Sequence, residues 1–441
     1  MRELTFDAAV IGGGAAGMSA AKSLVDRGFS TAIIERDRQL GGILLQCIHN
    51  GFGLQEFKEE LTGPEYAERW ERQLPPRGGR GLQVLLDTTV MELIPDSSGG
   101  DGDESRGDSH ARASMDGGGF TLVCVSPPQG YLHLRARAVV LATGCRERNR
   151  GNIRIPGTRP AGVYTAGLAQ RMVNMEGYLP GKDAVIVGSG DIGLIMARRL
   201  TWSGCRVHGA VEIQPYPSGL TRNIVQCLND FKIPLYLSHV VSRIHGKHRV
   251  EAVDITPLEE GRPNPHKTMT QECDTLLLSV GLIPSAELAR EAGAKLNPLT
   301  GGPGVDSRLM TSLPGLFSAG NVLHVHDLVD YVSAEARRAG ASAADYLEGR
   351  RPARQLRLKA GSNVRYLVPG SLDPDAPGPV FFRPMIVKNG ATVEFILDGE
   401  VLKTVKKTHI QPSEMIQIPT VGLDLSSRTM TPDSVLEVRL Q

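Results

Sequence analysis

The chain has 441 residues, of which 41% are hydrophobic and 22% charged, a balance typical of a soluble globular protein with about three domains. Its 49 Lys and Arg residues nearly match its 48 Asp and Glu residues, so no strong field is present to hold a nucleic acid. No run of about 18 apolar residues predicts a membrane span, and the first residues lack the layout of a signal peptide, so we expect a cytoplasmic protein.

The first third of the chain alternates strands with a helix. A strand at 6–14, a helix at 15–28 and a strand at 30–35 form a βαβ pattern, which predicts a parallel sheet. A further helix is predicted at about 64–74. Alternating apolar residues then predict an antiparallel meander of three strands at 84–94, 120–125 and 131–142.

Residues 97–119 interrupt that meander. They contain seven glycines and no Leu, Ile, Val or aromatic residue. Such a segment cannot bury a core of its own, so we predict a mobile loop.

A second βαβ pattern begins at Asp183, with a strand at 183–190, a helix at 191–204 and a strand at 205–212. The chain then returns to a glycine-rich run and a long helix at 328–349. From about 356 to 441 only short strand patterns remain, with Asp398-Gly399 as a hairpin turn, so we predict a small all-β C-terminal domain.

The first βαβ pattern carries the fingerprint Gly12-x-Gly14-x-x-Gly17. It follows a strand, opens a helix and is followed by Glu35 at the end of the next strand. Glycines there allow a tight turn and a close approach of a pyrophosphate to the helix N-terminus, and the acidic residue accepts hydrogen bonds from a ribose. The pattern predicts a dinucleotide site.

The second βαβ pattern repeats this fingerprint as Gly188-x-Gly190-x-x-Gly193, with Glu212 closing its second strand. The chain therefore has two dinucleotide sites. Glu212 would repel a 2′-phosphate, and Ile213 and Gln214 supply no cation beside it, so we predict NAD rather than NADP at the second site.

Ala142-Thr143-Gly144 follows an apolar strand, and LPGLFSAGNV precedes the last long helix. With the two fingerprints, this arrangement resembles the two-dinucleotide-binding-domain flavoproteins, the class of thioredoxin reductase and glutathione reductase, over residues 5–350. The resemblance implies an α/β fold of two Rossmann-like domains, the second inserted in the first. It implies an FAD-binding domain at 1–155 and 285–350, an NAD-binding domain at 156–284 and the β domain at 356–441.

The resemblance also implies roles for individual residues. Gly320 and Asn321 would contact the ribityl chain of FAD, and the last helix, beginning near His326 and Asp327, would point its positive end at the flavin. The further residues expected to line the FAD or NAD site are Ala15, Ala16, Arg36, Gly42, Gln46, Val90, Asp191, Ile192 and Gly281.

The cysteines depart from the disulfide reductases of this class. The redox motif G-G-x-C-x4-C corresponds to Gly41–His49, where Leu44 and His49 occupy the two cysteine positions. The six cysteines, which form no C-x-x-C pair, are Cys47, Cys124, Cys145, Cys205, Cys227 and Cys273. This pattern argues against internal dithiol exchange and against a zinc ribbon or an iron–sulfur cluster held by this chain alone.

Cys47 and His49 are the candidate catalytic residues, because this loop runs past the flavin in the related enzymes. Cys47 is either a thiolate acting beside the flavin or an inert buried thiol. His324 and His326 lack the spacing of a metal motif, so we expect no metal; contact with flavin or substrate stays open for them.

The runs GGILLQCIHNGFGLQEF, ATGCRERNRG and GNVLHVHDLVDYVSAEA resemble a subgroup of flavoproteins encoded beside bacterial glycerol-3-phosphate dehydrogenase-like enzymes, with a small cysteine-rich third protein. More distant similarity exists to subunits of amino-acid, opine and cyanide-forming dehydrogenases. The resemblance implies an FAD-dependent NAD(H) oxidoreductase that exchanges electrons with a partner protein, and we expect an oligomer.

Three alternatives remain open at this stage. The first is direct oxidation of a small amine or hydroxy acid, with His49 as the base. The second is a non-catalytic FAD scaffold. The third is oxidase or peroxidase chemistry at Cys47.

Overall fold

The computed structural model describes residues 2–76, 81–96, 118–350, 354–376, 378–428 and 430–441. The predicted mobile loop at 97–119 lies outside the described residues except for Gly118 and Gly119. The chain divides into two compact units, one comprising 1–45, 49–145 and 284–441, and the other comprising 46–48 and 146–283. No membrane-crossing helix is found among the described residues.

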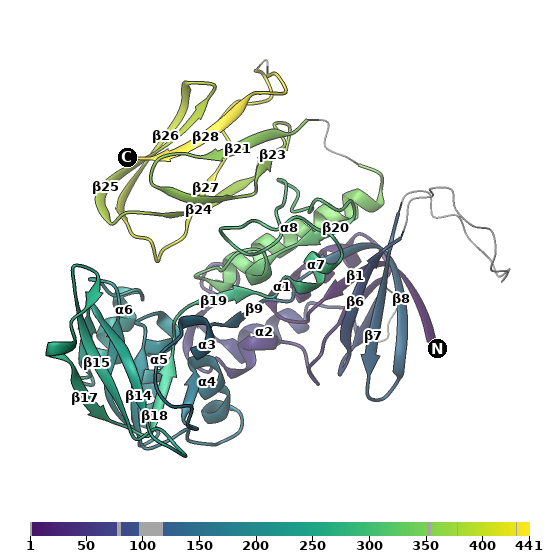
Figure 1. The fold of residues 1–441 in the computed structure, drawn as a ribbon. Helices are drawn as coiled ribbons and strands as arrows, with labels where there is room; N and C mark the ends of the chain where they lie inside the picture. The colour runs from purple at the N-terminus through teal and green to yellow at the C-terminus, as the bar shows by residue number, and fades with distance from the viewer. Residues whose placement is uncertain (1, 77–80, 97–117, 351–353, 377, 429) are drawn as a thin grey trace. The chain divides into compact units, whose positions relative to one another are not determined.

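The first unit is built on one mixed sheet, drawn from purple to blue in Figure 1. Its path runs β5-β2-β1-β8-β7-β6, and β20 also pairs with β8. These strands are β1 (Arg2–Ile11), β2 (Thr31–Ile34), β5 (Leu82–Leu85), β6 (Thr89–Pro95), β7 (Phe120–Ser126), β8 (Gly130–Leu141) and β20 (Leu316–Ser318). The strands around β1 are parallel, as the βαβ pattern predicts.

Strand β8 pairs in parallel with β1 from Leu132 to Leu141, and its other neighbour changes along its length. Its first half alternates between buried and more exposed residues and pairs antiparallel with β7, as predicted for a meander. Its last four residues are all buried, and this end pairs in parallel with β1 and β20. The prediction of a half-exposed strand is wrong for this end, because hydrophobic cores cover both of its faces: Ala138 and Val140 lie in one core, and Val139 and Leu141 lie in another.

Helices cover this sheet. They are α1 (Ala15–Asp26), α2 (Gly63–Glu71), α7 (Glu287–Glu291) and α8 (Val329–Leu347), with 3-10 turns η1 (Gly42–Gln46) and η4 (Gly320–Val322). The two-residue strand β4 (Leu61–Thr62) pairs with β3 (Asn50–Phe52) before α2, which begins with a capping box between Thr62 and Glu65. Helices α1 and α8 pack together in one buried core that includes Met18, Leu24, Ala336 and Ala339.

The second unit contains a five-stranded parallel sheet of order β10-β18-β11-β12-β13. Its strands are β10 (Val163–Thr165), β11 (Asp183–Val187), β12 (Arg206–Glu212), β13 (Leu235–Leu237) and β18 (Thr275–Leu278). Its helices are α3 (Arg150–Ile153), α4 (Ala166–Asn174), α5 (Asp191–Trp202), α6 (Thr221–Ile224) and the π turn η2 (Val225–Asn229). Strand β9 (Cys145–Glu147) pairs with β19 (Leu282–Pro284).

A smaller antiparallel sheet completes the second unit. Its members are β14 (His239–His245), β15 (Ala252–Glu259), β16 (Arg262–Pro263) and β17 (Met269–Glu272), and the 3-10 turn η3 (Pro265–Lys267) follows β16. The two sheets share a core of aliphatic residues that includes Val185, Val211, Ile244 and Leu276.

The C-terminal residues form two sheets within the first compact unit, drawn in green to yellow in Figure 1. One has the order β23-β21-β28-β25-β26 and the other β22-β24-β27. Asp398 and Gly399, both at positive φ, join β25 to β26 as the hairpin prediction requires. The strands are β21 (Leu356–Ala360), β22 (Val364–Val368), β23 (Ser371–Leu372), β24 (Pro379–Pro384), β25 (Lys388–Leu397), β26 (Glu400–Ile410), β27 (Ile416–Pro419) and β28 (Val435–Leu440).

Candidate functional site

The first glycine loop joins β1 to α1. Gly12 has φ +105°, and a Cβ atom there would lie 2.4 Å from the carbonyl oxygen of Ala142. A Cβ at Gly17 would lie 1.7 Å from the carbonyl oxygen of Gly12. Only glycine fits these positions, so the loop turns tightly and α1 begins close against β1.

The Glu35 carboxylate, at the end of β2, is buried and folds back on this loop. Its Oε2 accepts the N–H of Gly13 at 2.6 Å, and its Oε1 accepts the N–H of Asp37 at 2.8 Å. Each oxygen keeps acceptor capacity for a ribose hydroxyl.

The second glycine loop repeats this geometry between β11 and α5. A Cβ at Gly188 would lie 2.1 Å from the carbonyl oxygen of Ser279. Glu212 Oε2 accepts the N–H of Ser189 at 3.0 Å, and Oε1 accepts the N–H of Gln214 at 2.9 Å. Ser189 therefore corresponds to Gly13 and Gln214 to Asp37, so the two units share one local design.

Two serine hydroxyls also donate hydrogen bonds to the Glu212 carboxylate. Ser189 Oγ donates to Glu212 Oε2 at 2.6 Å and Ser218 Oγ donates at 3.0 Å. Sequence reasoning missed both serines, because Ser218 is six residues from Glu212 in an irregular segment. Together they hold the carboxylate in a defined orientation.

The N-termini of α1 and α5 also suit the pyrophosphate of a dinucleotide. The N-caps of α1 and α5 are Gly14 and Gly190, and neither helix has a side-chain cap. The first N–H groups of α1 are therefore left to an anion, which the positive end of the helix favours, whereas in α5 the Gly193 N–H already donates to Ser279 Oγ at 3.0 Å. A dinucleotide pyrophosphate is such an anion.

The residues predicted beside the first site fall into two groups. Ala15 and Ala16 are buried in the first turn of α1, and Gly42 lies beside Gly14, because a Cβ at Gly42 would be 3.4 Å from the Gly14 Cα atom. Arg36 is exposed, and Val90 lies in β6. Thr143 Oγ1 donates to the carbonyl of Ser285 at 2.8 Å, and the Ser285 N–H donates to the carbonyl of Gly144 at 3.0 Å.

Gln46 and Cys47 both contact α4 through Gln170. Gln46 Nε2 donates to Gln170 Oε1 at 3.0 Å and to the Gly167 carbonyl at 2.8 Å, and Cys47 Sγ lies 3.7 Å from Gln170 Oε1. Burial raises the pKa of Cys47 to about 12, so at neutral pH this group is a thiol. Gln170 was missed, since a lone glutamine in a helix carries no sequence signal.

His49 is partly exposed, and its ring lies 5.1 Å from that of Phe52. Leu44, at the other position of the missing redox pair, is buried in the core. All six cysteines lie in the described part of the chain, and none is disulfide-bonded.

The remaining predicted NAD residues surround α5. Asp191 Oδ1 accepts the Leu220 N–H at 2.8 Å and Asn223 Nδ2 at 2.6 Å, so its carboxylate holds the start of α6. Ile192 is half-buried, and the Gly281 carbonyl accepts the N–H of Arg148 at 2.9 Å.

Glu335, on α8, is a buried carboxylate that sequence reasoning missed. Its Oε2 accepts His324 Nε2 at 2.8 Å, and its Oε1 accepts His326 Nε2 at 3.1 Å and the Gly320 N–H at 2.7 Å. Each ring faces the carboxylate through Nε2, and neither Nδ1 atom has a hydrogen-bond partner. The Asn321 side-chain oxygen accepts the N–H of His326 at 3.0 Å.

The three side chains form a His–Glu–His group whose ligand atoms lie within 4.8 Å of one another, a set that also suits a metal ion. Burial alone would raise the pKa of Glu335, but His326 and His324 hold that pKa well below its usual value. Burial lowers the pKa of His324. The group is therefore a buried carboxylate that both histidine rings contact through Nε2.

Asp327 and the start of α8 differ from the prediction. The helix begins at Val329 after an extended Leu328, so His326 and Asp327 precede it. The Asp327 carboxylate accepts Arg383 Nη2 at 2.5 Å and the Met415 N–H at 2.6 Å, both from the C-terminal sheets. These contacts hold the residue outside the helix.

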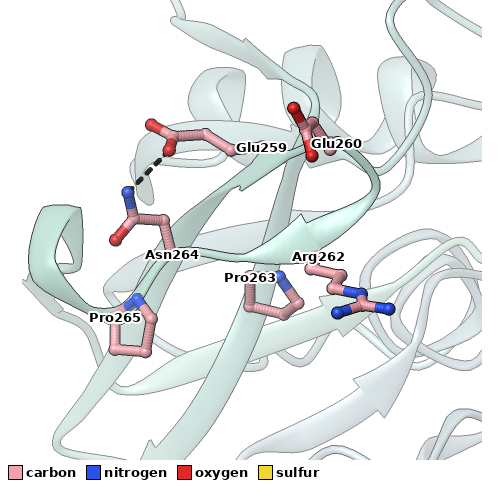
Figure 2. A pocket seen from close by; sticks show the side chains of 6 residues that line it. All are labelled: Glu259, Glu260, Arg262, Pro263, Asn264 and Pro265. Carbon is pink, nitrogen blue, oxygen red and sulfur yellow. Dashed lines mark hydrogen bonds between the residues drawn. The ribbon is translucent and has the colours of Figure 1, made fainter.

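A surface hollow elsewhere is unrelated to these sites. Figure 2 shows its six lining residues, which all belong to the β15–β16 turn and the residues after it. The hydrogen bond drawn there joins Asn264 Nδ2 to Glu259 Oε2 at 2.8 Å. None of the six residues that line the hollow is a predicted site residue.

Comparisons with known proteins agree with this geometry. The chain is 26% identical over 346 residues to a subunit of alkyl hydroperoxide reductase from Pseudomonas aeruginosa, covering 78% of this chain and 58% of that one. It is 24% identical over 343 residues to a subunit of opine oxidase from Rhizobium meliloti, covering 72% and 58%. It spans between 49% and 60% of the length of the first curated relatives.

Among solved structures, thioredoxin reductase of Lactococcus lactis matches with a TM-score of 0.59 and 18% identity, covering 78% of this chain and 99% of that chain. This likeness confirms the predicted α/β fold of two Rossmann-like domains. The family model for pyridine nucleotide-disulphide oxidoreductases matches residues 6–343, about three quarters of the chain. The chain therefore belongs to the pyridine nucleotide-disulphide oxidoreductase family, whose members are oxidoreductases that bind FAD and NAD(P)H.

Proposed function

We propose that this protein is an FAD-dependent NAD(H) oxidoreductase that exchanges electrons with a partner protein. The observation that carries the proposal is the pair of matched dinucleotide loops in a chain whose six cysteines include no disulfide. Because Leu44 and His49 occupy the two redox cysteine positions, the flavin would exchange electrons directly with an external acceptor. The names of two relatives, each one subunit of a larger enzyme, support an acceptor that is a protein.

The chain's own residues would perform four tasks. Gly12 and the N-terminus of α1 would hold the FAD pyrophosphate, and Glu35 would bind the ribose of its adenosine. Gly188 and Glu212 would do the same for NAD(H). FAD held there would supply the chemistry that takes up a hydride from NADH and gives two electrons to the acceptor, with the proton released on the acceptor side.

The acceptor side of the proposal rests on the loop at 41–49. His49 stands where the disulfide reductases of this class keep a redox cysteine, so it is the residue we propose for proton movement on that side. Cys47, as a buried thiol, would pack rather than react. On the resemblance of the sequence, the proposed partners are a small cysteine-rich protein and a glycerol-3-phosphate dehydrogenase-like subunit. We also propose a cytoplasmic oligomer.

The test is anaerobic titration of the purified, FAD-loaded protein with NADH, followed by the flavin absorbance band. Stoichiometric bleaching is expected. A flavin that NADH leaves oxidised, but that dithionite reduces, would overturn the NAD(H) assignment. It would favour direct oxidation of a small substrate or a scaffold role.

A further inference from the structure

Residues 320–328 form a connection between β20 and α8 that lies beside the first glycine loop. A Cβ at Gly320 would lie 3.1 Å from the Cβ of Ala16, in the first turn of α1. Ala16 is one of the residues whose N–H groups face the proposed FAD pyrophosphate. The position of this 320–328 segment therefore bears on how FAD is held.

The 320–328 segment is fixed on one side by α8. Glu335 binds the Gly320 N–H and both histidine rings, three donors to one buried carboxylate. Such charge-assisted hydrogen bonds are stronger than neutral ones, so the start of the segment has one defined arrangement.

On its other side the segment is fixed by the C-terminal sheets. Arg383 on β24 donates from Nη2 to the Val325 carbonyl at 3.1 Å and to Asp327 Oδ1 at 2.5 Å. The Asp327 and Arg383 side chains are only 23% and 15% exposed. The Phe381 ring lies 5.3 Å from the His324 ring and 5.5 Å from the His326 ring.

We propose that Arg383 and Asp327 form a clamp through which the C-terminal β domain positions the 320–328 segment against FAD, with Arg383 as a positioning residue. This inference rests on the proposed function. The family model ends at residue 343, so it includes Asp327 but not Arg383. The clamp gives the C-terminal domain a role in the flavin site without contact between Arg383 and the substrate.

The test compares Arg383→Ala, Asp327→Asn and the double variant with the wild type. We expect each single variant to raise the Kd for FAD by about tenfold, because a half-buried charged hydrogen bond is lost. The loss in the double variant should be smaller than the sum of the two single losses, since the bond between Arg383 and Asp327 is lost in each of them. The midpoint potential of bound FAD should also shift, because the 320–328 segment is no longer held in one arrangement beside the first glycine loop.

Arg439→Ala is the matched control. Arg439 Nε donates to Glu394 Oε2 at 2.7 Å within the C-terminal sheet, where the two side chains are 36% and 16% exposed, and neither residue lies in the 320–328 segment. We expect it to lower the melting temperature without changing the Kd or the potential. Arg383→Lys, which keeps the charge, should recover part of the FAD affinity and replaces Arg383→Ala if that variant does not fold.

Two results would overturn the proposal. One is that Arg383→Ala and Arg383→Lys both bind FAD with the Kd, absorbance spectrum and midpoint potential of the wild type. The other is an equal loss of FAD affinity in Arg439→Ala, which would show a general effect of stability. The Kd and the potential are measured without NADH, so a failure of NADH reduction in the wild type would refute the proposed function while leaving this test decisive.

Discussion

Glu212 is the residue on which the choice of coenzyme can be tested quantitatively. A carboxylate offers about four acceptor sites. Protein donors make three hydrogen bonds to Oε2 and one to Oε1. This leaves Oε1 as the oxygen open to a ribose hydroxyl of NADH.

We therefore expect Glu212→Ala to reduce the efficiency with NADH. A hydrogen bond to a charged group contributes about 1.5–3 kcal/mol, which corresponds to about 10- to 150-fold in apparent affinity. The efficiency with NADPH should rise, because the negative charge no longer repels its 2′-phosphate.

The assay is anaerobic stopped-flow reduction of the bound FAD over a range of NADH and NADPH concentrations. Ser218→Ala is the control, since it removes one donor to the carboxylate but keeps the charge, and its NADH to NADPH ratio should match the wild type. An unchanged ratio in a folded Glu212→Ala protein, or a wild type that prefers NADPH, would refute the reasoning.

Three further predictions follow from the site. Cys47→Ser should lower the free energy of unfolding by about 1–3 kcal/mol, since it buries a hydroxyl, and leave turnover per bound flavin unchanged; an altered flavin spectrum would instead indicate contact with the flavin. His49→Ala should slow electron transfer to the acceptor more than flavin reduction by NADH, and equal slowing of the two stopped-flow phases would contradict an acceptor-side role. Glu335→Gln should destabilise the protein by about 2–3 kcal/mol near pH 7 in urea unfolding. The pKa of Glu335 is depressed in the folded protein, so its charge stabilises the wild type above the unfolded pKa of about 4.3, and this stabilisation is lost as the pH falls further. The difference in unfolding free energy between wild type and Glu335→Gln should therefore be smaller near pH 3.5 than near pH 7. An equal difference at both pH values would refute the argument.

Both glycine loops could be predicted from the sequence because their chemistry is local. Gly12, Gly17 and Gly188 are constrained by backbone atoms that β-strand pairing brings close in any such unit. The acidic residue at the end of the second strand follows from the same local pattern. The two glycine fingerprints in their βαβ context thus predicted the dinucleotide-binding units, and Asp398-Gly399 predicted the hairpin.

The buried group around Glu335 could not be predicted in the same way. Its members come from an irregular turn and from a helix 9 to 11 residues later, so no periodic spacing connects them. The position of Asp327 depends on Arg383, 56 residues away in a different sheet. Contacts of this kind are set by tertiary packing, which sequence pattern alone does not contain.

The pairing of α1 with α8 has a consequence for synthesis on the ribosome. Met18 and Leu24 are covered in the finished protein by residues that emerge more than 300 positions later, and β1 gains its neighbour β8 only after residue 130. The continuous stretch 146–283 meets no such delay, because nearly all of its sheet partners lie within it. We expect the second dinucleotide unit to fold first, while the N-terminal helix still exposes an apolar face that a chaperone would recognise.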